Sequence, residues 1–162
     1  VGVLRLGESG IGKSEWALDL ISRGHRLISD DSVRVKQIGE RIIGSAPESI
    51  RDYLEIRGLG IINARELFGV SALSPLAEVR FCIEFTELTA SSNNDRLGLE
   101  PSVVRILGID VQKYSIPVRP GRNLATLVEA AVRVFVSRLG GPHAVEKLIA
   151  QHNQAVAATT PE

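Results

Sequence analysis

The chain has 162 residues, enough for one domain with a sizeable hydrophobic core. Its 19 lysines and arginines balance 19 aspartates and glutamates, so no net charge favours nucleic acid or an acidic membrane as a partner. The single cysteine, Cys82, excludes an internal disulfide, and neither a signal peptide nor an apolar run of membrane length is visible. We therefore expect a cytoplasmic protein that binds neither nucleic acid nor membrane.

The chain opens with a pattern of strand, glycine-rich loop and helix. Residues 1–6 are rich in valine and leucine, as a buried strand requires, and a helix is expected from Ser14 to Arg23, closed by Gly24 as its C′ residue. Because Val1 stands inside the strand and no methionine precedes it, we expect that an upstream region has been removed. The loop between strand and helix is Gly7-Glu8-Ser9-Gly10-Ile11-Gly12-Lys13-Ser14.

This loop fits G-x-x-x-x-G-K-[ST], the pattern that wraps nucleoside polyphosphates. Its glycines allow the backbone N–H groups to point at phosphate oxygens, and the helix N-terminus adds positive potential. We expect the loop to hold ATP or pyrophosphate, with Lys13 reaching the β/γ-phosphates and the Ser14 hydroxyl contacting Mg²⁺. The alternative is a glycine-rich turn before an ordinary helix.

The middle of the chain is rich in predicted strands. Leu27-Ile28 is a short apolar strand, and 33–38 with 41–43 form a hairpin around Gly39-Glu40. Short helical turns are expected at 47–54 and 65–68. Residues 79–85 form the clearest strand, with Cys82 as a buried, inert thiol and one apolar face made of Val79, Phe81, Ile83 and Phe85.

The last third predicts three short strands followed by helices. The strands are 103–107, 109–111 and 114–118, the last at an edge because it contains Pro117. A long helix from Asn123 has an apolar stripe and ends at Gly140-Gly141. The stripe consists of Leu124, Leu127, Val128, Ala131, Phe135 and Leu139. A further helix from Pro142 and a frayed tail over 155–162 complete an α/β domain, residues 1–154, with a mixed sheet.

Two adjacent acids, Asp30 and Asp31, end the short strand at Leu27-Ile28. Phosphoryl transfer needs a carboxylate near the metal as well as a phosphate cradle. The interval from Lys13 to Asp30 leaves room for one helix and one strand, so the acids can return beside the loop. Because neighbouring side chains of an extended chain point to opposite faces, we expect one acid to face Mg²⁺ and the other the phosphoryl acceptor. Alternatively, they cap the turn into Ser32.

A run of ten residues combines a hard oxygen ligand, Glu55, with a planar cation, Arg57, and with glycines that permit close backbone approach. The run is Leu54-Glu55-Ile56-Arg57-Gly58-Leu59-Gly60-Ile61-Ile62-Asn63. An Asp-Asp pair so soon after the phosphate loop is compatible with two enzyme families, phosphoenolpyruvate carboxykinase and HPr kinase/phosphorylase. The run 54–63 favours the second. The chain resembles the catalytic domain of HPr kinase/phosphorylase, the bacterial enzyme that acts on a serine of the phosphocarrier protein HPr. Other matching segments are Gly7 to Glu15, Arg26 to Asp31, Leu67-Phe68-Gly69, Asp95-Arg96-Leu97-Gly98, Ile116-Pro117-Val118 and Gly121-Arg122-Asn123.

The resemblance implies a role for individual residues. Ser14 and Glu55 would contact Mg²⁺, and Asp31, beside Asp30, would accept the proton of the serine hydroxyl during phosphorylation and return it during phosphorolysis. Arg96 would stabilise the transferring phosphoryl group; otherwise it is an ordinary partner of Asp95. The segment needed mainly for dephosphorylation would be Val118, Arg119, Pro120, Gly121, Arg122 and Asn123, which without the resemblance reads as a basic turn.

The resemblance also implies a nucleotide-binding core similar to that of phosphoenolpyruvate carboxykinase, a homohexamer and a role in regulating carbon metabolism. One departure is that the family's catalytic histidine, one strand upstream of the loop, is absent. His25, His143 and His152 stand in the wrong places to replace it. Asn63 also stands where relatives often have aspartate. A carboxykinase-like phosphotransferase acting on a small acid and a nucleotide-sensing domain without turnover remain as alternatives.

Overall fold

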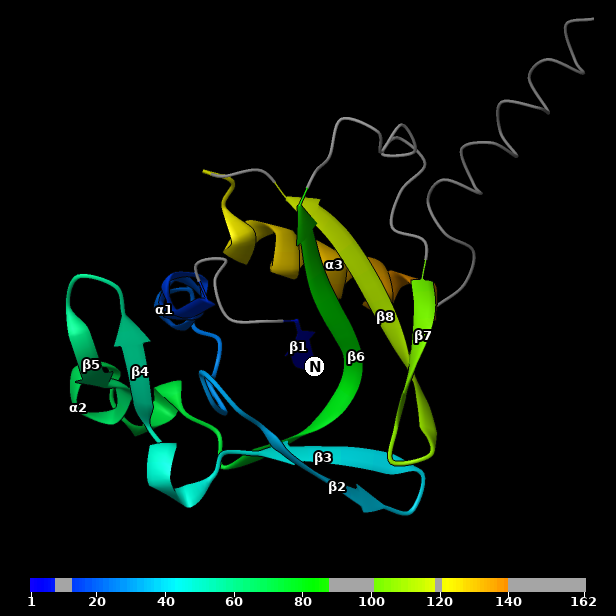
Figure 1. The fold of residues 1–162 in the computed structure, drawn as a ribbon, viewed down its shortest axis with the longest axis horizontal. Coiled ribbons are helices and arrows are strands. Elements are labelled where there is room, and N and C mark those ends of the chain that lie inside the picture. The colour runs from blue at the N-terminus through cyan, green and yellow to red at the C-terminus, as the bar shows by residue number, and fades with distance from the viewer. Residues whose placement is uncertain (8–12, 88–100, 119–120, 140–162) are drawn as a thin grey trace, which may run out of the picture.

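The computed structural model describes residues 1–7, 13–87, 101–118 and 121–139. Its centre is a strongly curved mixed sheet of six strands, with two helices on one side and a small hairpin unit beside them (Figure 1). The strands of the sheet are β1 (Gly2–Leu6), β2 (Arg34–Ile38), β3 (Arg41–Ser45), β6 (Leu76–Glu87), β7 (Pro101–Ile106) and β8 (Ile109–Val118). The expected α/β fold with a mixed sheet is confirmed.

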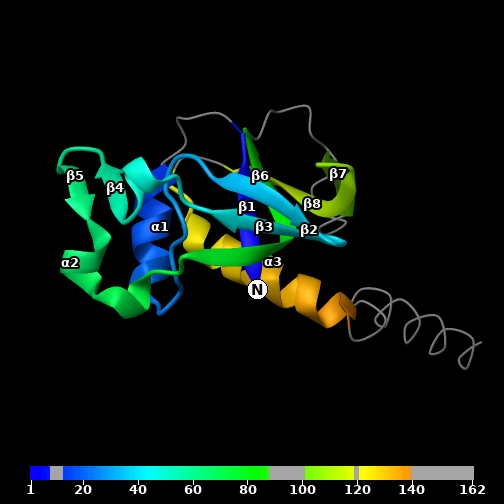
Figure 2. The same cartoon turned by 90° about the horizontal axis from the view of Figure 1, so that it is seen from below.

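Strand β6 organises the sheet because it pairs with three others. Its first residues pair antiparallel with β3, and its later residues pair parallel with β1 and with β8. The hairpins β2–β3 and β7–β8 extend the sheet on either side as antiparallel additions. Figure 2 shows β1 and β6 running side by side in the same direction. Parallel strands need a crossover, and α1 with the segment that follows it supplies one between β1 and β6.

The remaining elements lie on or beside this sheet. Helix α1 (Lys13–Ser22) follows the loop, and α3 (Leu124–Leu139) follows β8. Strands β4 (Tyr53–Ile56) and β5 (Gly60–Asn63) form a separate two-stranded hairpin that continues into α2 (Ala64–Phe68), and single 3₁₀ turns occur at Glu48–Ile50 and Val70–Ala72. No helix of the described residues is long and apolar enough to span a bilayer.

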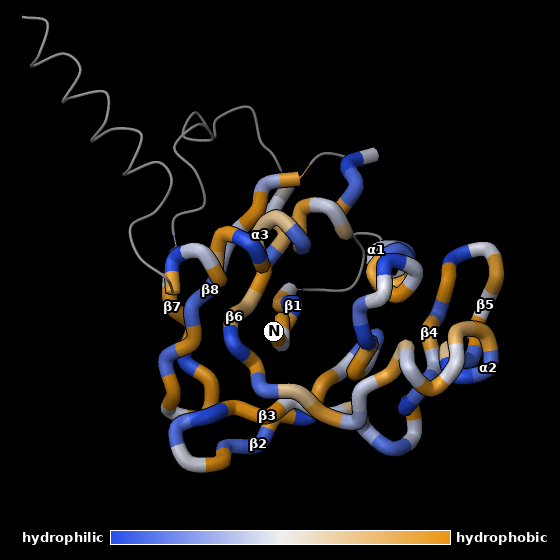
Figure 3. Tube along the Cα trace, turned by 180° about the vertical axis from the view of Figure 1, so that it is seen from behind, coloured by the Kyte–Doolittle hydropathy of each residue, from blue (hydrophilic) through white to orange (hydrophobic). Residues whose placement is uncertain are grey.

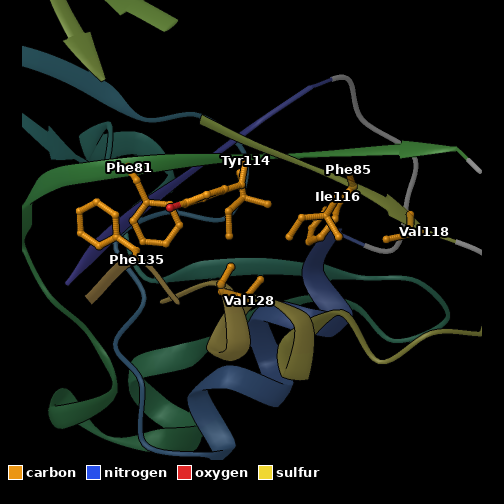
Figure 4. Close-up of a cluster of buried hydrophobic side chains, with 9 residues drawn as sticks. Phe81, Phe85, Tyr114, Ile116, Val118, Val128 and Phe135 are labelled. Atoms are coloured by element: carbon orange, nitrogen blue, oxygen red, sulfur yellow. The ribbon is translucent and has the colours of Figure 1, made fainter. Parts of the chain in front are cut away.

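The main core fills the space between the sheet and α3. Alternate residues of β6 and β8 point at one stripe of α3 (Figure 4). The rings of Phe81 and Phe135 stack with centroids 4.7 Å apart, and Tyr114 meets Phe81 edge to face at 5.6 Å. The buried members of this cluster are Phe81, Ile83, Phe85, Tyr114, Ile116, Val118, Val128, Ala131 and Phe135.

One face of β6 differs from the expected alternation. Phe81, Ile83 and Phe85 share the face toward α3, but Val79 packs on the opposite face with the cluster that contains Cys82. The cause is an irregularity in the pairing with β1, where Gly2 lies opposite Val79 and its neighbour Val3 opposite Phe81. The extra residue, Arg80, shifts the alternation by one position, so the prediction for Val79 was wrong.

Other helices and strands begin or end at residues that differ from the predicted ones. Leu27 forms only an isolated bridge to Leu73 instead of a strand, and the predicted turn at 47–54 covers only Glu48–Ile50. The two predicted strands 109–111 and 114–118 are one strand, β8, whose last residues, including Pro117, have β6 as their only described partner. Leu139, assigned to the buried stripe of α3, is 62% exposed because it extends past the sheet. The predictions for 140–162 lie outside the described residues.

The Cys82 thiol provides a test of this packing. The side chain is fully buried, and desolvation raises its pKa from 9.0 to about 11, although the Lys113 ammonium opposes part of the rise. Because the thiolate is the nucleophile, this higher pKa makes the reactive, deprotonated fraction of the thiol roughly a hundredfold smaller. We expect iodoacetamide at pH 8 to alkylate the native protein at least about a hundredfold more slowly than the urea-unfolded chain. Equal rates would contradict the burial of this thiol.

Candidate active site

The site begins where the parallel strands end. Strands β1, β6 and β8 run in the same direction, with Leu6 opposite Glu84 in one pair and Glu87 opposite Val118 in the other. The segments that follow them therefore leave the same edge of the sheet. These segments are the phosphate loop after β1, residues 88–100 after β6, and the predicted dephosphorylation segment after β8. In open α/β sheets, ligands bind at such carboxyl edges.

The flanks of the phosphate loop agree with the expected strand and helix. Strand β1 ends at Leu6, Gly7 has a φ of +106°, and α1 begins at Lys13. A positive φ is easy for glycine and strained for other residues, so Gly7 permits the chain to turn out of the strand. Residues 8–12, and the side chains of Lys13 and Ser14, lie outside the described part, as does Arg96. The predicted phosphate contacts of these residues stay predictions.

The two acids occupy different environments. Asp30 is half-buried, and its Oδ2 accepts a hydrogen bond from the backbone N–H of Glu55 at 3.1 Å. Asp31 is exposed. Arg5 of β1 lies near Asp30: burial lowers the pKa of its guanidinium, and the Asp30 carboxylate opposes part of that shift. Asp30 thus lies between β1 and β4, whereas the Asp31 side chain is open to solvent.

The hydrogen bond to Glu55 connects the acid pair with the hairpin β4–β5. Leu54 and Ile56 are buried on one face of β4, whereas Glu55 is exposed on the other, opposite Ile61 of β5. Leu54 packs with Ala17 and Ile21 of α1, so the hairpin is fixed to the helix that follows the phosphate loop. The turn uses Gly58 and Gly60, whose φ values are +85° and +86°.

Asn63 has a structural role at the end of this run. Its side-chain oxygen accepts hydrogen bonds from the backbone N–H groups of Arg65 at 2.9 Å and Glu66 at 3.3 Å, which caps α2. An aspartate oxygen caps a helix in the same way. Asparagine and aspartate are therefore both compatible with this cap.

A cavity of about 750 Å³ lies beside the acids, between β1, α1, α3 and the segment 25–33. Figure 3 shows β1 between β6 and α1, with α3 adjacent. Gly7, Asp30 and Asp31 all line the cavity, so the start of the phosphate loop and both carboxylates share one space. The buried Trp16 Nε1 and Ser29 Oγ also lie in its wall and have no hydrogen-bond partner within the described residues. Volume and lining are in the range of small-molecule sites.

The described residues do not form a metal site of three or more His, Cys, Asp or Glu side chains. The two residues expected to bind Mg²⁺, Glu55 and Ser14, would suit an ion that arrives with a nucleotide. Mg²⁺ keeps several waters and uses one or two protein oxygens plus phosphate oxygens. Glu55 offers an exposed carboxylate whose backbone is anchored by Asp30. Ser14 would supply the second protein oxygen.

The predicted dephosphorylation segment is described at both ends. Val118 is buried at the end of β8, residues 119–120 lie outside the described part, and Gly121 has a φ of +84°. Arg122 is exposed, and Asn123 caps α3 by accepting the N–H of Thr126 at 2.8 Å.

Sequence reasoning missed a polar network that joins α1 to the start of α3. Arg23 pairs with Asp19 and Glu129 at 2.9 and 3.1 Å, and Asn123 donates to Asp19 at 3.2 Å. The i, i+4 spacing of Asp19 and Arg23 was a visible signal for their pairing. The partners on α3 are about a hundred positions away and gave no local signal. His25, expected at a helix end, is half-exposed and contacts Glu129 at 2.8 Å.

Comparisons with known proteins identify the family to which the chain belongs. A model of the HPr Serine kinase C-terminal domain matches residues 1–152. The chain is 47% identical over 149 residues to an HPr kinase/phosphorylase from Caldanaerobacter subterraneus, covering 91% of this chain and 49% of that protein. It is 48% identical over 157 residues to one from Geobacillus thermodenitrificans, covering 96% and 51%. The chain thus spans about half the length of the curated relatives it matches.

A solved structure extends the comparison to the fold. The HPr(Ser) kinase/phosphatase from Coxiella burnetii superposes with a TM-score of 0.77 at 38% identity, covering 86% of this chain and 90% of that one. At this identity and coverage, the two structures share the fold of the whole domain.

The contact between Asp30 and Glu55 leads to a stability prediction. Replacing Asp30 with alanine removes the acceptor of a backbone N–H, and we expect the free energy of unfolding to fall by about 1–3 kcal/mol. Asp31→Ala is the matched control, because that side chain is exposed, and its effect should stay within about 0.5 kcal/mol. Urea denaturation measures both, and hydrogen exchange should accelerate at the Glu55 amide only in Asp30→Ala. Equal losses would contradict different tasks for the two acids.

Proposed function

The chain belongs to the HPr kinase/phosphorylase family, and we propose that it phosphorylates a serine of HPr with ATP or pyrophosphate and removes that phosphate with inorganic phosphate. The observation that carries the proposal is the hydrogen bond between Asp30 and the Glu55 N–H. It connects the acid pair, which lines the cavity together with Gly7, to the signature hairpin. A cradle, a base and a metal ligand are the parts that phosphoryl transfer needs.

In the kinase direction, the serine oxygen attacks the γ-phosphorus of ATP while Asp31 takes the hydroxyl proton. The bond from that phosphorus to the β–γ bridging oxygen breaks, and ADP leaves. Asp31 suits this task because its side chain is exposed at the cavity, where a protein substrate can reach it. A correctly placed base of this kind contributes about 10²–10⁴ to the rate.

In the opposite direction, an oxygen of inorganic phosphate attacks the phosphorus of phosphoserine. The bond to the serine oxygen breaks, Asp31 returns a proton to that oxygen, and pyrophosphate leaves. Microscopic reversibility makes the base of one direction the acid of the other. Arg96 and Arg122 supply planar cations for the transferred and the incoming phosphate, and Arg119 adds a third.

The metal is assigned to Ser14 and Glu55. When bound, Mg²⁺ neutralises charge on the phosphate oxygens. Asp30 holds the Glu55 backbone through its N–H, so the carboxylate of Glu55 is presented from a fixed strand. Lys13 at the start of α1 completes the cradle.

Further proposals concern the protein's context. The mixed sheet with its loop after β1 supports a nucleotide-binding core similar to that of phosphoenolpyruvate carboxykinase. We place the activity in the cytoplasm, in the regulation of carbon metabolism through HPr. Assembly into a homohexamer is supported by exposed apolar side chains of the β4–β5–α2 unit. These are Leu59, Ile61 and Leu67, and the exposed Val70 follows in the adjacent 3₁₀ turn.

The proposed chemistry is tested with ATP, Mg²⁺ and HPr, followed by inorganic phosphate, using the full-length natural protein because the relatives are about twice as long as this chain. We expect phosphoserine on HPr by mass and then release of pyrophosphate. Asp31→Asn should lower both rates by about 10²–10⁴ while nucleotide affinity by calorimetry is retained. Lys13→Ala is the contrasting variant, because it should weaken nucleotide affinity itself. Nucleotide binding with no transfer to HPr would instead favour a sensing domain.

Assembly is tested by sedimentation equilibrium, where the mass should be six times that of one chain. Ile61→Asp should shift the protein to smaller species, because a charge in an apolar contact is strongly unfavourable. Val103→Asp on β7, which alters a similarly exposed valine outside the β4–β5–α2 unit, is the control and should leave the mass unchanged. A monomer in the unsubstituted protein would contradict the hexamer.

A further inference from the structure

We propose that Asp19 is a positioning residue for phosphorolysis, holding Asn123, and with it the end of the dephosphorylation segment, against the helix that follows the phosphate loop. The inference rests on the proposed function and assigns a task to a side chain outside the predicted site. The contact that carries it is the hydrogen bond from Asn123 Nδ2 to Asp19 Oδ2 at 3.2 Å, which joins residues 104 positions apart.

Asn123 uses both ends of its side-chain amide. Its oxygen caps α3 by accepting the N–H of Thr126 at 2.8 Å, and its nitrogen donates to Asp19 on α1. The cap fixes Asn123 relative to α3, and the second hydrogen bond fixes it relative to α1. One side chain therefore sets where the chain enters α3, immediately after Arg122.

Asp19 is itself held in place. Both of its carboxylate oxygens accept hydrogen bonds from Arg23, from Nε and Nη2, each at 2.9 Å. Hydrogen bonding from Arg23 lowers the pKa of Asp19, and the contact from Asn123 acts in the same direction. The carboxylate therefore stays ionised near neutral pH, and its orientation is set by a planar, two-point contact.

The position of this contact relates it to the chemistry. Asp19 lies six residues after Lys13 on the same helix, about 9 Å along its axis. Because Asn123 is fixed beside α1, the preceding residue, Arg122, is held close to the same helix. Inorganic phosphate is a substrate of phosphorolysis but not of the kinase reaction with ATP, so a contact that positions Arg122 for inorganic phosphate should affect phosphorolysis selectively.

Arg23 provides a second connection that does not involve Asn123. It contacts Glu129 at 3.1 Å and Thr126 Oγ1 at 3.3 Å, both on α3. Removing the Asp19 carboxylate therefore leaves α1 tied to α3 and leaves the cap of α3 intact. This separates the effect on Asn123 from a general loss of packing.

The test measures both directions in the full-length natural protein. We expect Asp19→Ala to raise the KM for inorganic phosphate about five- to tenfold, with kcat/KM for ATP in the kinase direction changing less than about twofold. Ser22→Ala is the matched control, because Ser22 lies on the same helix and its hydroxyl bonds only the carbonyl of Leu18 among the described contacts. It should change neither parameter.

A second variant tests the contact itself. Asn123→Ser keeps a capping oxygen but loses the nitrogen that donates to Asp19, so it should also raise the KM for inorganic phosphate. If both variants break one contact, the double variant Asp19→Ala/Asn123→Ser should be no worse than the worse single one. Additive effects would overturn the proposal.

Two further outcomes separate this inference from the proposed function. Normal phosphorolysis with an unchanged KM for phosphate in Asp19→Ala, or equal losses in both directions, would overturn the positioning role alone. Absence of phosphorolysis in the unsubstituted protein would overturn the proposed function and this inference with it.

Discussion

The parallel pairing of β1 and β8 with β6 is the constraint on which the site depends. Because the three strands point the same way, the segments after Leu6, Glu87 and Val118 all start at one edge of the sheet. The core between β6, β8 and α3 holds this arrangement through stacked aromatic rings and alternate aliphatic side chains. Loss of register in either parallel pair would separate the phosphate loop from the segments expected to act on the transferred group.

The parts that could be predicted from the sequence depend on neighbouring residues. The strand, turn and helix around the phosphate loop follow from apolar runs and a glycine with positive φ, and all their determinants are adjacent in the chain. The face of Val79 could not be predicted, because the irregularity at Arg80 arises from pairing with β1, far away in sequence. The contact between Asn123 and Asp19 could not be predicted for the same reason, because the residues around each of them give no indication of the other.

The signature run at 54–63 shows how one strand serves both the fold and the site. Alternation along β4 buries Leu54 and Ile56 and exposes Glu55 between them. The buried pair fixes the hairpin against α1, and the Asp30 carboxylate fixes the backbone of the exposed residue from the side. The sequence suggested ligand chemistry for Glu55 but not this support, because Asp30 acts on a backbone N–H, which carries no residue-type signal. Asp30 thus also supports the hairpin, beside the role at the metal or the acceptor that the sequence predicts for the acid pair.

A reaction that one carboxylate serves in both directions raises the question of what sets the balance between them. In the proposed mechanism Asp31 would change the two rates together, because whatever affects its acceptance of a proton also affects the return of that proton. The balance must therefore come from groups that meet only one of the two attacking nucleophiles. Inorganic phosphate is such a nucleophile, and Arg122 immediately precedes Asn123, which joins the start of α3 to α1 through Asp19. The network of Asp19, Arg23 and Asn123 adds charged and capping hydrogen bonds to the apolar packing between these two helices. Such contacts are directional, so they can set the position of a phosphate-binding arginine without contributing much to the stability of the core.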